Sequence, residues 1–293
     1  MCVSTKPKVL VFGSISVDNI WELSRIPRDH EKIDAKAMYT VVGGSGANTA
    51  SWLSNFGHDV TLIGAVGDDV DSKWIISELE SQKIKAKSIK RIKGKTANHA
   101  ISLISGSTKR IIRQRNIDMK NISWGISELK TLINKVDHVH ISSIESKTSE
   151  DISNIARSLN KSISIELNGH KMSAQRKNAD VLFCNSIELK TIFNISISKL
   201  SSAGLAKMIP GFNGNLVVTN GANSVVAVTP HFKITEKVKK WGRIKDRTGA
   251  GDSFDAGFLS SWLTNSPENV SKAIKVGMAT SASCVMNFGG QAK

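Results

Sequence analysis

The residues best suited to do chemistry stand in the run TGAGDSFDAGF, at positions 248–258. Gly249, Ala250 and Gly251 leave their backbone N–H groups uncovered, and a helical pattern that begins at Asp252 aims its positive end at the same point. A carboxylate there can accept a proton from a hydroxyl group while the N–H groups stabilise a transferred phosphoryl group. An aspartate at a helix start is also an ordinary cap, so this run alone leaves both interpretations open.

A second glycine-rich turn lies in VVGGSGANTASWLSNFG, at positions 41–57. Gly43, Gly44 and Gly46 allow a close approach of the backbone, and the helix that follows offers free N–H groups, so the turn could hold a polar ligand. The turn has neither the G-x-G-x-x-G spacing of a dinucleotide site nor the Gly-Lys-Ser/Thr of a P-loop. By itself it indicates a tight turn into a helix.

The elements that must position these turns alternate along most of the chain. Short apolar runs typical of strands occupy residues 8–15, 59–67, 138–142, 162–167, 180–185 and 215–221. Helical patterns occupy residues 46–56, 70–82, 149–160, 186–193, 203–209, 252–263 and 268–286. This alternation predicts an α/β fold with a doubly wound, mainly parallel sheet flanked by helices.

Two segments interrupt the alternation, residues 19–42 and residues 96–115. Both have an alternating pattern with turn residues, and the second contains SGST between two strand-like runs, which indicates a hairpin. We therefore expect residues 1–293 to form one α/β domain, with a small β-sheet built from these two insertions beside the main sheet.

Composition restricts the class of protein and its partners. Forty Lys and Arg against 25 Asp and Glu leave a net charge of +15, which attracts polyanions such as nucleic acid or nucleotide phosphates. Residues 83–115 hold many of these basic residues but lack the interleaved aromatic residues of a base-stacking surface, which is typical of a solvated face. No run is long enough to span a membrane, no signal segment is visible, and the three cysteines lie far apart. We therefore expect a cytoplasmic protein with reduced thiols, which binds neither a membrane nor nucleic acid.

Five motifs, in order along the chain, resemble the PfkB, or ribokinase-like, family of carbohydrate and nucleoside kinases. They are VFGSISVDNIWEL at 11–23, GGSGANTASWLSNFGHDVTLIGAVGDD at 43–69, NSIE at 185–188, VVTNGANSVVAV at 217–228 and DRTGAGDSFDAGF at 246–258. The resemblance covers nearly the whole chain. It implies a ribokinase-like fold in which the small sheet is a lid, and an ATP- and Mg²⁺-dependent transfer of phosphate to a hydroxymethyl group of a small sugar.

The resemblance also assigns roles to residues of this chain. It makes Asp252 the catalytic base, with Gly249, Ala250 and Gly251 as the anion hole. The residues implied to hold substrate hydroxyls are Asp18, Gly44 and Asn48. Those implied on the nucleotide side are Asn185, Glu188, Thr219, Asn220, Gly221 and Asn287, with Glu188 reaching Mg²⁺ through water. Asp246 and Thr248 are implied as ligands of a monovalent cation, K⁺, that many members of the family use.

Some positions depart from the family pattern. Ser45 stands where ribokinases often carry Lys, which weakens ribose as the expected substrate. Arg247 stands where the family often has a small hydroxyl residue. The chain ends at NFGGQAK, so the last family element is expected to be short. We interpret Asp255 as a favourable charge near a helix N-terminus, and His99, His138 and His140 as structural residues.

Other functions stay open at the level of sequence. A nucleoside kinase needs a surface on which the base can stack, and Trp21 or Tyr39 could supply it. A sugar-phosphate kinase needs cations near a second phosphate, for which the hairpin offers Lys109, Arg110, Arg113 and Arg115. A non-catalytic protein that binds nucleic acid is disfavoured by the intact Gly-Ala-Gly-Asp run. The lids of two copies are expected to pair in a homodimer, because an exposed sheet edge benefits from cover.

Overall fold

The computed structural model describes residues 6–142, 144–171, 175–239, 242–264 and 269–293. Its main sheet has eight strands in the order β14-β13-β12-β11-β10-β9-β1-β4. They are β1 (Lys8–Phe12), β4 (Asp59–Ile63), β9 (His138–Ser142), β10 (Ser162–Glu166), β11 (Val181–Asn185), β12 (Asn215–Thr219), β13 (Ser224–Val228) and β14 (Lys233–Lys237). Strands β12 to β4 run parallel, and β13 and β14 add an antiparallel edge. The predicted fold class is confirmed.

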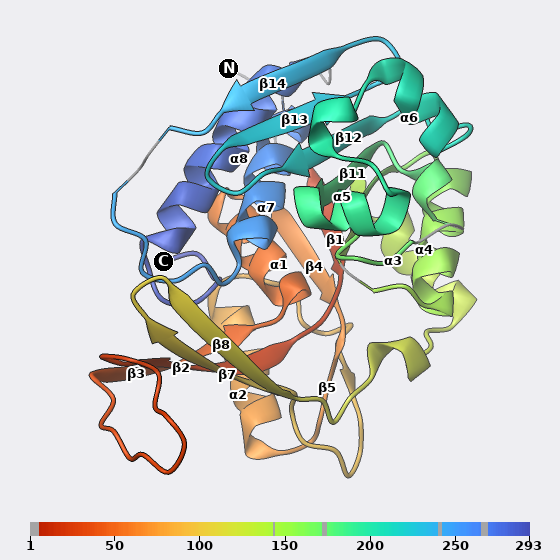
Figure 1. Ribbon diagram of the computed structural model, residues 1–293. Helices are drawn as coiled ribbons and strands as arrows, with labels where there is room; N and C mark the ends of the chain where they lie inside the picture. The colour runs from red at the N-terminus through yellow and green to blue at the C-terminus, as the bar shows by residue number, and fades with distance from the viewer. Residues whose placement is uncertain (1–5, 143, 172–174, 240–241, 265–268) are drawn as a thin grey trace, which may run out of the picture.

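Helices cover both faces of this sheet (Figure 1). One layer consists of α1 (Ser45–Asn55), α2 (Val70–Ser81), α7 (Ala250–Thr264) and α8 (Val270–Val285). The other consists of α3 (Ile126–Asn134), α4 (Lys147–Ser158), α5 (Ser186–Phe193) and α6 (Ser202–Met208). Side chains of β1 point alternately to the two helical layers: Val9 and Val11 pack against the first, and Leu10 and Phe12 pack against the second. Strands buried on both faces explain why their sequences are almost wholly apolar.

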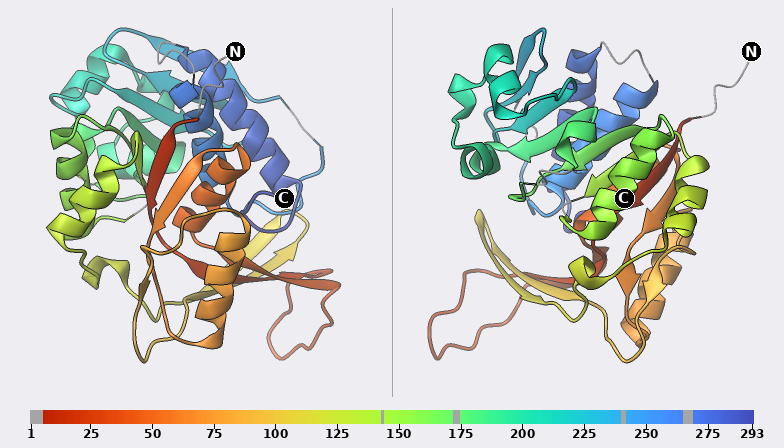
Figure 2. Two further views of the ribbon diagram at one scale, coloured as in Figure 1. Left: turned by 180° about the vertical axis from the view of Figure 1, so that it is seen from behind. Right: turned by 90° about the vertical axis from the view of Figure 1, so that its right-hand side faces the viewer.

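A separate four-stranded sheet projects from one end of this body (Figure 2). It consists of β2 (Ser16–Glu22), β3 (Ala37–Gly43), β7 (His99–Ser105) and β8 (Thr108–Gln114), in the order β3-β2-β7-β8. We call it the lid. It begins at Ser16, three residues before the expected segment, so Asp18 lies within a lid strand. Two short strands, β5 (Ala65–Val66) and β6 (Lys90–Arg91), pair only with each other among the described residues.

The two faces of the lid differ in character. On the inner face, Ile20 and Ile104 pack against Phe288, which follows α8. The opposite face carries Trp21 and Ile112, with 38% and 61% of their surfaces exposed. Because side chains of a strand alternate between faces, Asp18 shares the inner face with Ile20, and Trp21 points away from it.

Three features of the described elements bear on the expectations from sequence. The helix expected at 186–193 has those bounds, whereas α3 and the edge strand β14 were not expected. Cys184 and Cys284 are buried free thiols. No helix within the described ranges has the length and apolar character needed to cross a membrane.

Candidate active site

Asp252 lies in the first turn of α7, directly after a glycine-rich bend. Gly249 has a φ of 72°, and a Cβ there would come within 2.4 Å of the Cα of Gly290, so only glycine fits without strain. The first bond of the helical ladder runs from Ser253 N to Gly249 O at 2.8 Å. The N–H groups of Gly251 and Asp252 therefore precede the ladder at the helix mouth, where an anion is favoured. The Ala250 N–H, also predicted for the anion hole, donates a long bond of 3.4 Å to Arg247 O.

The Asp252 carboxyl is buried and held by an amide from α1. Asn48 Nδ2 donates to Asp252 Oδ2 at 2.7 Å. Burial, followed by the negative charge of Glu166, raises the pKa of Asp252 well above its usual value, against the opposing effect of the Asn48 hydrogen bond. A carboxylate with a raised pKa is a stronger proton acceptor, so this environment suits a general base.

Asp18 faces the same site from the lid strand β2. Gly43 leaves it room, because a Cβ there would lie 2.2 Å from Asp18 Cγ. Ser16 Oγ donates to Asp18 Oδ1 at 2.8 Å. Burial raises the pKa of Asp18, and the charge of Asp18 in turn contributes to the raised pKa of Asp252. The structure thus brings Asp18 of the lid close enough to Asp252 of the main domain for their charges to interact.

Gly44 and Asn48 complete this side of the site. Gly44 is the N-cap of α1 with a φ of 92°, and a Cβ there would lie 2.5 Å from Ser14 O. Asn48 is 3% exposed, and its Oδ1 has no hydrogen-bond partner among the described residues. An amide with one buried acceptor still open can bind a hydroxyl group that enters the site.

Two further carboxyls belong to this region: Glu166, which the sequence did not single out, and Asp255, for which the sequence indicated no role in the site. Glu166 ends strand β10 and accepts a bond of 3.1 Å from Ser142 Oγ. Asp255 is 3% exposed, and its Oδ2 lacks a partner within the described parts of the chain. Burial, then the charges of Glu166, Asp252 and Glu188, raise the pKa of Asp255 well above its usual value. Asp255 was interpreted from sequence as a favourable charge near a helix N-terminus, whereas the structure buries it where the ionised form is disfavoured.

A sequence signal for both acids existed. Glu166 is the only acid in the run SISIEL, at the carboxyl end of a parallel strand, where ligands of α/β sheets bind. Asp255 follows Asp252 by three positions, which places both on one helical face.

Asn185 and Glu188 form a reciprocal cap at the start of α5. Asn185 Nδ2 donates to Glu188 Oε1 at 2.6 Å, and the Asn185 side chain accepts from Ile187 N and Glu188 N. Burial raises the pKa of Glu188. Glu188, Glu166 and Asp255 carry carboxylate oxygens, which are the ligands that Mg²⁺ prefers, and Asp255 Oδ2 has no partner among the described residues. Within the described ranges these three carboxyls do not all come within ligand distance of one another, so they suit an ion that is held largely through water.

The residues predicted for the nucleotide side mostly gather at the neighbouring strand ends. Thr219 ends β12 opposite Asn185 of β11. Ser186 Oγ donates to Asn220 Oδ1 at 2.9 Å, and Gly221, with a φ of 54°, has open space on the side where a Cβ would stand. Asn287 lies apart, after α8, where its amide donates to Ser283 O at 3.0 Å. Its nucleotide role stays a prediction.

The residues predicted to hold a monovalent cation contact a lysine of the lid. Lys109 Nζ donates to Asp246 Oδ1 at 3.1 Å and also to Thr248 Oγ1. The same strand, β8, carries Arg113, which pairs with Ala100 opposite Asp18. The positive charges of Lys109 and Arg113 partly oppose the rise that burial causes in the pKa of Asp18. Arg110 lies between them in sequence, so it faces outward.

Neither aromatic residue proposed for base stacking faces the site freely. Trp21 lies on the outer face of the lid. Tyr39 stacks on Phe288, with ring centroids 4.6 Å apart and an interplanar angle of 20°. Neither ring is therefore placed for a nucleoside base to stack on it in the site.

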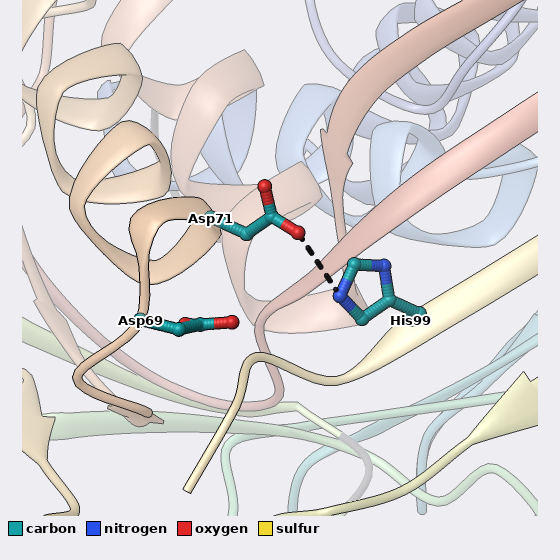
Figure 3. A group of neighbouring side chains, drawn as sticks. All are labelled: Asp69, Asp71 and His99. Atoms are coloured by element: carbon teal, nitrogen blue, oxygen red, sulfur yellow. Dashed lines mark ion pairs between the residues drawn. The ribbon is translucent and has the colours of Figure 1, made fainter.

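A second cluster of ionisable groups lies where the lid meets α2 (Figure 3). Asp69, Asp71 and His99 have ligand atoms within 4.8 Å of one another, and Asp71 Oδ2 lies 3.3 Å from His99 Nε2. Asp69 is already engaged, because its carboxylate caps α2 through Ser72 N and also accepts from Ala97 N. We interpret the cluster of Asp69, Asp71 and His99 as a connection between lid and body.

His138 and His140 are buried and bonded to serines of β10, which agrees with their structural interpretation.

The site has a side with buried carboxyls and an amide that suits hydroxyl groups, and a side at the neighbouring strand ends that suits a nucleotide. This fold and this site are typical of a small-molecule kinase, an enzyme that phosphorylates an alcohol group. The chain belongs to the pfkB family of carbohydrate kinases, whose model matches residues 6–293. It is therefore a carbohydrate or nucleoside kinase.

Relatives in this family differ in their substrates. An ATP-dependent ribose-1-phosphate kinase of Halopiger xanaduensis is 26% identical over 94% of this chain and 90% of its own. A ribokinase of Lactococcus lactis is 24% identical over 97% and 92%, and a nucleoside kinase of Methanothermobacter thermautotrophicus is 27% identical over 87% and 82%. The solved structure of Arabidopsis thaliana ribokinase complexed with ribose and ATP aligns over 98% of this chain and 96% of its own, with a TM-score of 0.83 and 20% identity.

Proposed function

We propose that the protein transfers the γ-phosphoryl group of ATP to a hydroxymethyl group of a small sugar, with Asp252 as the general base. The observation that carries this proposal is the buried Asp252 carboxyl, which has a raised pKa, a hydrogen bond from Asn48 and a position at the mouth of α7. Ribose and ATP in the complex of the Arabidopsis thaliana ribokinase support the choice of both substrates.

In this proposal each side of the site has its own task. Asp18 and Asn48 hold sugar hydroxyls, and Asp252 takes the proton of the attacking hydroxyl. The N–H groups of Gly249, Ala250 and Gly251 stabilise the transferred phosphoryl group. Mg²⁺, when bound, neutralises charge on the ATP phosphates, and the residues that would hold it are Glu188 through water, Glu166 and Asp255. The lid excludes water from the reaction.

The test is Asp252→Asn, which keeps the shape of the side chain and removes the base. ADP release is measured with Mg²⁺ on a panel of sugars, sugar phosphates and nucleosides, with Glu128→Gln on the exposed side of α3 as the matched control. We expect kcat of Asp252→Asn to fall by about 10²-fold or more, because general bases contribute at least that much. A loss smaller than about tenfold, with the control unaffected, would show that Asp252 is not the base.

A sugar phosphate is the second candidate substrate. Arg113 faces Asp18 from the inner side of the lid and could bind a second phosphate, and the relative of Halopiger xanaduensis is a ribose-1-phosphate kinase. The same panel decides between the two, since kcat/KM for ribose 1-phosphate above that for ribose would favour the phosphorylated substrate. A nucleoside is less favoured because Trp21 faces away and Tyr39 is stacked on Phe288.

The setting of the reaction is proposed on the same basis. ATP as the substrate and two buried free thiols favour the cytoplasm as the site of action. The exposed apolar outer face of the lid favours a homodimer in which two lids meet. Nucleic acid is not a proposed partner, because the buried carboxyls Asp18 and Asp252 on the inner side of the lid suit a ligand with hydroxyl groups and would repel a nucleic-acid backbone.

A further inference from the structure

Lys109 joins the lid to the loop that leads into α7. It is the second residue of β8, and its ammonium donates to Asp246 Oδ1 at 3.1 Å and to Thr248 Oγ1. The side chain of Asp246 is fully buried and that of Lys109 is 22% exposed. The buried carboxylate of Asp246 is thus balanced by the charge of Lys109, which belongs to the lid and lies 137 positions earlier in the chain.

The remaining bonds of Asp246 tie the loop that leads into the anion hole to the segment that follows α8. Asp246 Oδ1 accepts from Thr248 N at 2.9 Å and Thr248 Oγ1 at 2.7 Å, and Oδ2 accepts from Gly289 N at 3.1 Å. Burial would raise the pKa of Asp246, but the charge of Lys109 and these hydrogen bonds outweigh it and leave the pKa lowered. The carboxylate is therefore held ionised, two residues before the bend at Thr248 and Gly249.

The residues present do not fit K⁺ at this position. A potassium ion on Asp246 and Thr248 would use the oxygens that already accept from the Lys109 ammonium. Its charge would lie close to another positive charge in a buried place, where repulsion is poorly screened. An ammonium group has the same charge as K⁺ and also binds oxygen, so it can replace the ion.

We propose that the Lys109 ammonium serves as a built-in monovalent cation, which holds the loop before the anion hole in place of K⁺. The kinase then needs no added monovalent cation. Because Lys109 comes from the lid, the loop is held fully only when the lid is docked, which links lid closure to assembly of the anion hole. Lys109 is a positioning residue in this account, and the account rests on the proposed phosphoryl transfer.

The experiment compares the wild type with Lys109→Met, which removes the charge and keeps much of the apolar stem. Arg110→Met on the outer side of the same strand is the matched control. ADP release on the best substrate is followed in potassium-free buffer with tetramethylammonium, and then with added K⁺ or NH₄⁺ at constant ionic strength. We expect added K⁺ to change the wild-type kcat by less than about twofold. We expect kcat of Lys109→Met to fall by about tenfold or more without K⁺, because Asp246 is left as an uncompensated buried charge, and K⁺ or NH₄⁺ to restore most of it.

Thermal unfolding gives a readout that does not depend on turnover. K⁺ is expected to raise the Tm of Lys109→Met and to leave that of the wild type and of Arg110→Met unchanged. Strong activation of the wild type by K⁺ would overturn the inference, as would a Lys109→Met variant that no cation rescues in either assay. If the wild type phosphorylates nothing on the panel, the proposed reaction fails while the thermal comparison still decides the role of Lys109.

Discussion

At the scale of single residues, the site is governed by carboxyls that are costly to bury. Asp252 and Asp255 lie on one face of α7, and Glu166 approaches both from the end of β10. Burial raises the pKa of Asp252 and of Asp255, and the negative charge of Glu166 raises both further. Such a group of largely buried carboxyls destabilises the folded protein, and a cation bound beside them would offset that cost.

The cost of Asp255 can be measured through stability. Its pKa is raised in the folded chain, so the folded state binds more protons than the unfolded state, and stability falls as pH rises from the ordinary value of 3.8 through the raised value. In EDTA near neutral pH, Asp255→Asn is therefore expected to raise Tm by a few degrees, with the gain shrinking toward acid pH. Thermal scans across pH check this, with Glu128→Gln as the exposed control.

The response to Mg²⁺ distinguishes the cost of burying the Asp255 charge from a change in packing caused by the substitution. Added Mg²⁺ should stabilise the wild type more than Asp255→Asn, because the variant lacks one anionic ligand. A variant that is less stable than the wild type at neutral pH, or that gains as much from Mg²⁺, would contradict the assigned role of Asp255.

At the scale of elements, a short segment after α8 supports both halves of the site. Trp52 Nε1 of α1 donates to Gly290 O at 2.9 Å. Gly290 also lies against Gly249, and a Cβ on Gly290 would come within 2.5 Å of Asn48 Nδ2. The backbone of this segment is therefore the surface against which the Asn48 amide and the anion-hole bend are both positioned.

Replacement of Gly290 tests this support. Gly290→Ala must displace either Asn48 or the segment itself, so the hydrogen bond from Asn48 to Asp252 is expected to be lost. We expect kcat to fall by about tenfold or more, since misplacement of a catalytic group by about 1 Å has costs of that order. Steady-state kinetics and circular dichroism check this, with Gly125→Ala, whose added Cβ meets only Glu128 Cβ at 4.0 Å, as the control. Unchanged kinetics in Gly290→Ala would refute the proposed support.

The same elements show why sequence alone reaches only part of this site. The Asn185 and Glu188 cap is local, so the helix from 186 to 193 could be predicted with its bounds. Helix α3 was missed because it buries only Leu129 and Ile133 and starts without a side-chain cap. The pairs of Lys109 with Asp246 and of Glu166 with Asp255 arise from strands and helices far apart in the sequence, and no spacing rule can reveal such a meeting.

At the scale of the whole molecule, the lid leaves an apolar surface without a partner in the monomer. Its outer face carries Trp21 and Met38 as a cross-strand pair, and Ile101 and Ile112 as another, all of them exposed. Exposed apolar patches of this kind mark contact surfaces, and the free edges β3 and β8 would be covered in the same contact. A second copy of the chain offers the same surface, so a symmetric lid-to-lid dimer covers both at once.

Ile112→Glu places a charge on this surface, in the edge strand β8, on a side chain that is 61% exposed and supports no core. Because a symmetric interface uses the same surface of both copies, the variant would bury two unpaired glutamates in one contact, and it is expected to sediment as a monomer where the wild type sediments as a dimer. Analytical ultracentrifugation at micromolar concentration measures this, with Ile126→Glu at the exposed start of α3 as the matched control. A monomeric wild type, or a dimeric Ile112→Glu variant, would rule out the lid as the interface. Loss of kcat in the monomeric variant would further show that the dimer holds the lid in the position at which Lys109 reaches Asp246.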